Sequence, residues 1–251
     1  MSGHNKWSSI KHQKGAADAK RGQLFTKLTR EIIVAVRQGG SDADANYRLR
    51  LGIQKAHDSN MPYDNIDRAI KKGSGEGEGA ALVELDLEGY GPGGAAIIVH
   101  AVSDNRNRTL PDIRNVFSRH GGNMGESGSV AWLFDTRGII TVEAGSLNKE
   151  DLELKAIDAG ADDVKIEDGY MEIYTRPEDL ETVRKGLEHQ GIPIASSGIA
   201  TVPKAPVHLQ EKAALTTLKL LEKLEELDDV DNVTSNVDFT DDILEKYRSQ
   251  P

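Results

Sequence analysis

The 251-residue chain contains no cysteine, which excludes disulfide scaffolds, thiolate zinc sites and cysteine nucleophiles. It has no run approaching the roughly 18 consecutive apolar residues of a membrane helix, and its first residues lack the apolar segment of a secretion signal. Its histidines show no H-E-x-x-H spacing, and no G-x-x-x-x-G-K-[ST] phosphate loop occurs. These absences predict a cytoplasmic protein that uses no membrane, metal, cofactor or small-molecule substrate, and they favour a protein that is not an enzyme.

Positive and negative charges are distributed unevenly along the chain. Residues 1–72 hold 14 Lys+Arg and 7 Asp+Glu, a formal charge of +7, and the remaining 17 and 34 give −17 for residues 73–251. This uneven charge distribution is typical of a basic module that binds polyanions, joined to an acidic part of the chain that does not bind them.

Hydrophobic periodicity predicts three helices in the basic module, over residues 18–38, 41–56 and 62–73. The Gly-rich stretch at 73–81 has linker composition, which favours a domain boundary. Beyond it, the pattern predicts strands at 82–88, 95–102 and 130–134, and a helix at 110–120.

The second half of the chain predicts an inserted domain. Residues 138–203 follow the order β-α-β-β-α-β of the ferredoxin-like split unit. A Leu-rich helix at 209–227 and a strand at 232–239 then complete the unit interrupted near residue 135. We therefore expect an α+β protein, with an N-terminal three-helix domain followed by two α/β sandwich-type domains, one of them ferredoxin-like and inserted in the other. The predicted domains are residues 1–73 (basic tail and helices), 82–135 plus 205–240 (discontinuous), and 138–203 (inserted).

One glycine motif suggests a nucleotide site but predicts a turn. Gly89, Gly91 and Gly94 match G-x-G-x-x-G. That fingerprint needs a helix after its third glycine to present an N-terminus to pyrophosphate. Here a β-branched strand follows, and Pro92 lies inside the loop. We interpret the motif as a hairpin turn.

The N-terminal module carries the strongest functional signal. At about 100° per residue, the apolar side chains of 18–38 share one face, and four basic residues from Lys20 to Arg37 share another. Residues 1–17 contain three lysines and no acid, and Trp7 offers an indole that can stack on a base. The alternative is a solvated tail with Trp7 packed on its own domain. The predicted nucleic-acid-binding residues, including two from a later segment, are Lys6, Trp7, Lys11, His12, Lys14, Lys20, Lys27, Arg30, Arg37, Arg106 and Arg108.

Two further polar segments allow more than one interpretation. In SDNRNRTLPD (103–112), Thr109 and Asp112 resemble a capping box that starts a helix. Equally, Arg106 and Arg108 in an exposed loop would grip phosphates. The acidic stretch at 225–229 is interpreted as a solvated surface at a helix end.

Three motifs in order, at residues 3–32, 88–97 and 103–134, resemble the YebC/PmpR family, which includes the mitochondrial translational activator of cytochrome oxidase. Among them are GHNKWSSIKHQKGAADAKRG, EGYGPGGAAI and FSRHGGNMGESGSVAWLF. The resemblance spans essentially the whole chain. It implies a helical first domain, two α/β domains and no catalytic activity. It also implies either regulation of transcription through promoter DNA or assistance to ribosomes on proline-rich sequences.

Together these observations predict a non-enzymatic nucleic-acid-binding regulator of gene expression, whose partner is DNA or ribosomal RNA. Transcriptional regulation by DNA binding is the role that the resemblance names first. The alternatives are a ribosome-associated translation factor that relieves stalling, and an enzyme with a site between the two α/β domains.

Overall fold

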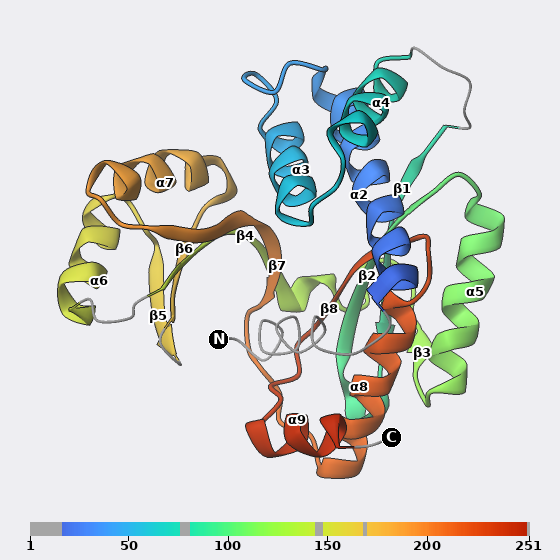
Figure 1. Cartoon of the computed structure of the whole chain (residues 1–251). Coiled ribbons are helices and arrows are strands. Elements are labelled where there is room, and N and C mark those ends of the chain that lie inside the picture. Colours follow the sequence, from blue (N-terminus) through green and yellow to red (C-terminus); the bar gives the residue numbers. More distant parts are fainter. Residues whose placement is uncertain (1–16, 76–80, 144–147, 168–169, 250–251) are drawn as a thin grey trace. The chain divides into compact units, whose positions relative to one another are not determined.

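The computed structural model describes residues 17–75, 81–143, 148–167 and 170–249. Helices precede and alternate with the strands of two four-stranded sheets, which confirms the predicted α+β class (Figure 1). The described residues form two compact units. One unit contains 17–131 and 210–233, and the other contains 132–209 and 234–249.

Three helices begin the first unit, as the periodicity predicts: α2 (Ala17–Gly39), α3 (Tyr47–Asp58) and α4 (Tyr63–Gly73). Gly73 allows α2 and α4 to approach closely, because a Cβ there would lie 2.6 Å from the Cβ of Val36. The helices enclose one apolar core, made of Leu28, Ile32, Ile33, Ala35, Val36, Leu49, Ala56, Met61, Ile66 and Ala69.

The second helix begins at Tyr47, six residues later than predicted. Asn46 caps it, and its side-chain oxygen accepts a hydrogen bond from the Leu49 amide at 3.1 Å. The Asn46 amide group also donates to the carbonyls of Ala35 and Gly40, each at 2.7 Å. Because these bonds fix Asn46 outside the helix, the preceding residues form a turn.

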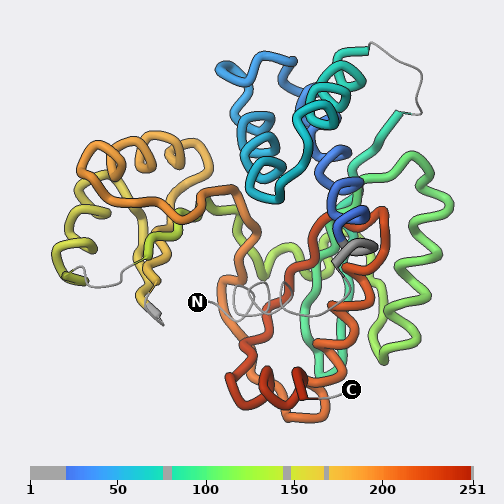
Figure 2. The backbone as a smooth tube through the Cα atoms, viewed as in Figure 1, coloured from blue at the N-terminus to red at the C-terminus, as the bar shows by residue number. Residues whose placement is uncertain are grey.

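The first sheet has the strand order β3-β1-β2-β8. β1 and β2 form an antiparallel hairpin through the short helix η1, so the glycine motif is a turn, as predicted. Figure 2 shows α8, late in the chain, returning to the strands formed early in the chain. The bounds are β1 (Val83–Tyr90), η1 (Pro92–Gly94), β2 (Ala96–Ser103), α5 (Arg106–Arg119), β3 (Asn123–Met124), α8 (Glu211–Glu225) and β8 (Val230–Ser235).

The two faces of the first sheet differ in character. Phe117 of α5 approaches β1, where a Cβ on Gly89 would lie 2.7 Å from its ring. Leu220 of α8 approaches the turn after β1, where a Cβ on Gly91 would lie 3.5 Å from it. Because strand side chains alternate, Glu84, Asp86 and His100 point to the opposite face. The buried sides of α5 and α8 therefore cover one face, and charged side chains occupy the other.

The second sheet has the order β5-β6-β4-β7, and each pair of neighbouring strands is antiparallel. With helices after the first and third strands, this is the ferredoxin-like arrangement that the sequence predicts. β8 returns to the first sheet beside β2, as an insertion requires. The exact domain boundaries stay a prediction. The bounds are η2 (Ala131–Leu133), β4 (Phe134–Glu143), α6 (Lys149–Asp158), β5 (Asp163–Glu167), β6 (Tyr170–Thr175), η3 (Pro177–Asp179), α7 (Leu180–His189) and β7 (Ile194–Pro203).

The strand predicted at 130–134 is wrong. The Glu88 carboxylate accepts hydrogen bonds from the amides of Gly128, Val130 and Ala131 at 2.6 to 2.7 Å. These amides are therefore not available to a strand ladder, and residues 131–133 form the short helix η2 instead. Trp132 in η2 is 66% exposed.

Two other boundaries also differ from the prediction. The helix expected at 110–120 begins at Arg106, because Asn105 rather than Thr109 caps it through the Arg108 amide. The final strand ends at Ser235 rather than residue 239. An unpredicted eight-residue helix, α9 (Asp241–Arg248), follows it.

Candidate nucleic-acid interface

The polar face of α2 contacts an acidic turn, defined as residues 225–229, which runs from the last residue of α8 to the residue before β8. The Gln23 side-chain amide donates to the Glu226 carbonyl at 2.5 Å and to an Asp228 carboxylate oxygen at 3.0 Å. Lys27 Nζ donates to the Glu225 carbonyl at 2.6 Å. A helix end carries unpaired carbonyls and a partial negative charge, so the end of α8 is a natural partner for these donors.

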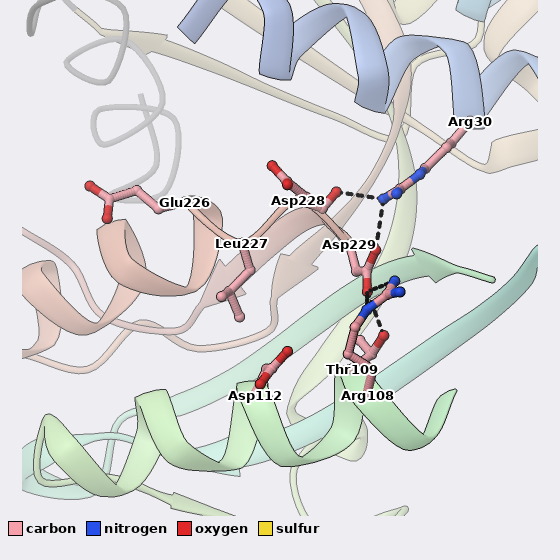
Figure 3. A pocket seen from close by; sticks show the side chains of 8 residues that line it. All are labelled: Arg30, Arg108, Thr109, Asp112, Glu226, Leu227, Asp228 and Asp229. Atoms are coloured by element: carbon pink, nitrogen blue, oxygen red, sulfur yellow. Dashed lines mark hydrogen bonds and ion pairs between the residues drawn. The ribbon is translucent and has the colours of Figure 1, made fainter. Parts of the chain in front are cut away.

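Arg30 extends this contact to the first sheet. Its Nη1 lies 2.9 Å from Asp229 Oδ1 and donates to the Asp228 carbonyl at 2.7 Å (Figure 3). A longer bond of 3.4 Å reaches the Val102 carbonyl on β2. One arginine therefore joins α2, the acidic turn and the first sheet.

Asp229 is the centre of the network, and only 8% of it is exposed. Its Oδ2 accepts hydrogen bonds from Arg108 Nη2 and Thr109 Oγ1, both at 2.7 Å, and from Ser103 Oγ at 3.1 Å. With Arg30 on Oδ1, both carboxylate oxygens are fully engaged. The expected solvated surface is thus wrong at this residue, because the β8 strand that follows draws Asp229 inward.

The pKa of Asp229 lies below its ordinary value. Burial raises it, but hydrogen bonds from Thr109 and Arg108, together with the charges of Arg30 and Arg108, lower it by more. The carboxylate is therefore ionised at neutral pH, and it compensates the two guanidinium groups.

A cavity of about 450 Å³ lies beside this network within the same unit (Figure 3). Its carboxylates outnumber its two guanidinium groups, and Asp229 already holds both of these. The cavity therefore lacks the free positive charge of an anion pocket. It is lined by Arg30, Arg108, Thr109, Asp112, Glu226, Leu227, Asp228 and Asp229.

The structure thus separates the predicted binding residues into groups. Lys27, Arg30 and Arg108 come together around the acidic turn. Arg37 and Arg106 are exposed and lie outside that network. Lys20 lies in the first turn of α2. Five predicted residues lie outside the described residues: Lys6, Trp7, Lys11, His12 and Lys14.

A second charged group lies on the opposite face of the first sheet. His100 Nδ1 lies 2.7 Å from Asp86 Oδ1, and its Nε2 lies 3.4 Å from Glu84 Oε1. Arg48 of α3 pairs with Glu84, and Lys55 pairs with Glu31 of α2 at 2.7 Å. The module and the sheet are therefore joined by ion pairs on this side.

The pKa of His100 is raised above its ordinary value near 6.5 by the hydrogen bond to Asp86, and the charges of Asp86, Asp231 and Glu84 add to this against the opposing effect of burial. The stability that protonated His100 adds to the folded state is therefore complete below about pH 6.5, and it is lost as pH rises through the higher pKa of the folded state. We expect His100→Gln to remove about 1 kcal/mol of stability at pH 6 and less at pH 9. Urea unfolding at both pH values measures this. His57→Gln, an exposed histidine on α3, is the control, and an equal loss at both pH values would contradict the assignment.

Within the described residues, no three His, Asp or Glu side chains are placed to hold a metal ion. None of the helices found there combines the length and apolar character needed to cross a membrane.

Comparison with known proteins covers nearly the entire chain. Residues 5–76 match the TACO1/YebC protein N-terminal domain, and residues 82–237 match the TACO1/YebC second and third domain. A probable transcriptional regulatory protein of Dehalococcoides mccartyi is 60% identical over 100% of both chains. Another, from Desulfosudis oleivorans, is 51% identical over 98% of this chain and 100% of its own.

A solved structure supports the same grouping. The crystal structure of a conserved hypothetical protein from Aquifex aeolicus matches with a TM-score of 0.83 and 49% sequence identity. The match covers 94% of this chain and 97% of that one. With both domain matches in order along the sequence, the chain belongs to the TACO1/YebC family.

Proposed function

We propose that the chain is a non-enzymatic regulator of gene expression that binds nucleic acid through its basic N-terminal module. The observation that carries this proposal is the charge of +7 on residues 1–72, against −17 on the rest of the chain. Lysine and arginine neutralise phosphates, and this electrostatic contribution dominates non-specific binding of nucleic acids. The relatives' names, probable transcriptional regulatory protein, support a regulatory role.

Two targets fit this role, namely promoter DNA and ribosomal RNA. Specific reading of a duplex requires arginine, asparagine or glutamine side chains that reach base edges in the major groove. Two amides lie on the polar face of α2: the hydrogen bonds of Gln23 go to the acidic turn, and the Gln38 side-chain amide donates to the Glu84 carboxylate. This leaves α2 with the chemistry of phosphate binding rather than of base reading.

The charge of the body favours the ribosome. A long duplex repels an acidic body, whereas ribosomal RNA is interleaved with basic proteins that offset this repulsion. We therefore propose association with the ribosome as a second candidate function. The observation that supports it is that the Gln23 side-chain amide binds the acidic turn instead of being available to read bases.

Competition titrations beside gradient sedimentation distinguish the two. We expect duplex binding to be nearly independent of sequence, with a Kd on the order of 10⁻⁴ to 10⁻⁶ M at physiological salt. The chain should sediment with ribosomes and lose that association when residues 1–17 are removed. A preference of about 10³ or more for one promoter, without ribosomal association, would instead establish the DNA target. Absence of binding to either would overturn the proposed function.

A further inference from the structure

Helix α5 is a basic element within the acidic part of the chain. It holds four arginines and one aspartate, a formal charge of +3, whereas residues 73–251 together carry −17. The structure places this charge on an exposed surface. We define the α5 outer face as Asn107, Arg114, Asn115, Ser118 and Arg119, all of which are exposed.

The helix geometry separates this face from the core. Thr109, Ile113 and Phe117 are the buried residues of α5. At about 100° per residue, the outer face is centred roughly 160° away from them. The arginines of the outer face therefore point away from the sheet, and α5 is visible along the edge of the unit in Figure 1.

The outer arginines lack the ion pairs that other helices provide. Several exposed basic residues on other helices pair with an acid one turn away, as Lys71 does with Asp67 and Lys155 with Asp151. Three or four residues from Arg114 and Arg119, α5 offers only Leu110, Pro111, Phe117, Ser118, Asn115 and Val116. Among the described residues, neither guanidinium group has a hydrogen bond or an ion pair.

The outer arginines also differ from those near the acidic turn. Arg30 and Arg108 are both held by Asp229. This shared partner places the first turn of α5 next to the middle of α2. Arg114 and Arg119 lie further along α5 and take no part in this network.

We propose that the α5 outer face is a second contact surface for nucleic acid, on which Arg114 and Arg119 bind phosphodiester groups of the backbone. Guanidinium groups bind phosphate oxygens in a bidentate manner, and the neighbouring asparagines add neutral donors. The 14 residues of α5 extend about 21 Å, which is roughly the length of six base pairs. This inference rests on the proposed function, but it adds a site that lies outside the basic N-terminal module.

The test compares three double variants of the full chain on a 20-base-pair DNA duplex and on an RNA hairpin with a long stem. Arg114→Gln with Arg119→Gln removes both guanidinium groups, and Arg114→Lys with Arg119→Lys keeps both charges. The control, Lys149→Gln with Arg248→Gln, removes the same total charge from exposed ends of α6 and α9. Thermal unfolding of all variants shows that each remains folded.

Loss of two phosphate contacts should flatten the slope of log K against log salt by about 1.8 on a duplex. Between 50 and 200 mM salt, this corresponds to about a 12-fold smaller loss of affinity than in the wild type. The lysine variant and the control should keep the wild-type slope. The probe on which the slope changes identifies the source of the phosphates as DNA or RNA.

Three results would overturn the inference. If the glutamine variant keeps the wild-type slope on both probes while the wild type binds, α5 is not a contact surface, although the proposed function stands. An equal change in the control would mean that total charge, rather than α5, governs binding. If the wild type binds neither probe, the proposed function fails and this inference fails with it.

Discussion

Replacing Asp229 with alanine should lower the free energy of unfolding by about 3 kcal/mol, because the change leaves several donors without their acceptor. Arg30 loses its carboxylate partner, and the buried hydroxyls of Ser103 and Thr109 lose an acceptor. Removing one member of a buried ion pair is costly, since the remaining charge stays desolvated. Urea unfolding followed by circular dichroism measures the change.

Asp112→Ala is the matched control, because Asp112 lines the same cavity but is exposed. It should change stability by no more than about 0.5 kcal/mol. The pKa of Asp229 lies below its ordinary value, so its stabilisation is present above about pH 4 and is lost as pH falls further. The wild type and Asp229→Ala should therefore converge in stability in acid. A constant difference down to pH 2 would contradict this account of Asp229.

Glu88→Gln should cost about 2 to 3 kcal/mol, although it changes the side-chain volume very little. Both carboxylate oxygens accept backbone amides, Oε1 from Gly128 and Oε2 from Val130 and Ala131. A glutamine NH₂ group in place of either carboxylate oxygen would set a hydrogen-bond donor against the N–H donors of the backbone. Since Glu88 is only 7% exposed, water cannot replace the lost bonds. Hydrogen exchange of these amides should accelerate along with the loss of stability.

Glu126→Gln, an exposed residue in the same loop, should leave both stability and amide exchange near their wild-type values. If Glu88→Gln behaved like this control, the carboxylate would not be what fixes residues 128–131. The direction of the Glu88 pKa shift also indicates that the backbone amides bind the ionised carboxylate. Burial raises it, but the three backbone bonds lower it by more, so it lies below the ordinary value.

The regular elements could be predicted because periodicity reports them directly. The apolar spacing in α2 and the β-α-β-β-α-β order of 138–203 each depend on local pattern, and the structure confirms both. The predicted boundaries are wrong where a side chain that is distant in sequence forms hydrogen bonds with backbone groups. Asn46 delays α3 through bonds to Ala35 and Gly40, and Glu88 prevents a strand at 130–134. No periodicity in sequence reports such contacts.

The candidate site could be predicted less completely, for the same reason. Helical spacing places Lys27 and Arg30 on the polar face of α2, but it does not reveal that the acidic turn, about 200 residues later, meets that face. Asp229 reads as one acid among several in EELDD. Its one distinguishing signal is its place immediately before strand β8. The sequence does not distinguish Arg114 and Arg119 from other arginines, because only the fold determines which acids lie near them.

The most direct test of the central claim, that this chain acts by binding nucleic acid, is ultraviolet cross-linking in the host cell, followed by mass spectrometry of the cross-linked peptides. The account predicts nucleotide adducts on peptides from residues 1–40 and from α5, and sequencing of the attached nucleic acid identifies DNA or ribosomal RNA. Absence of adducts, or adducts confined to residues 148–203, would contradict it.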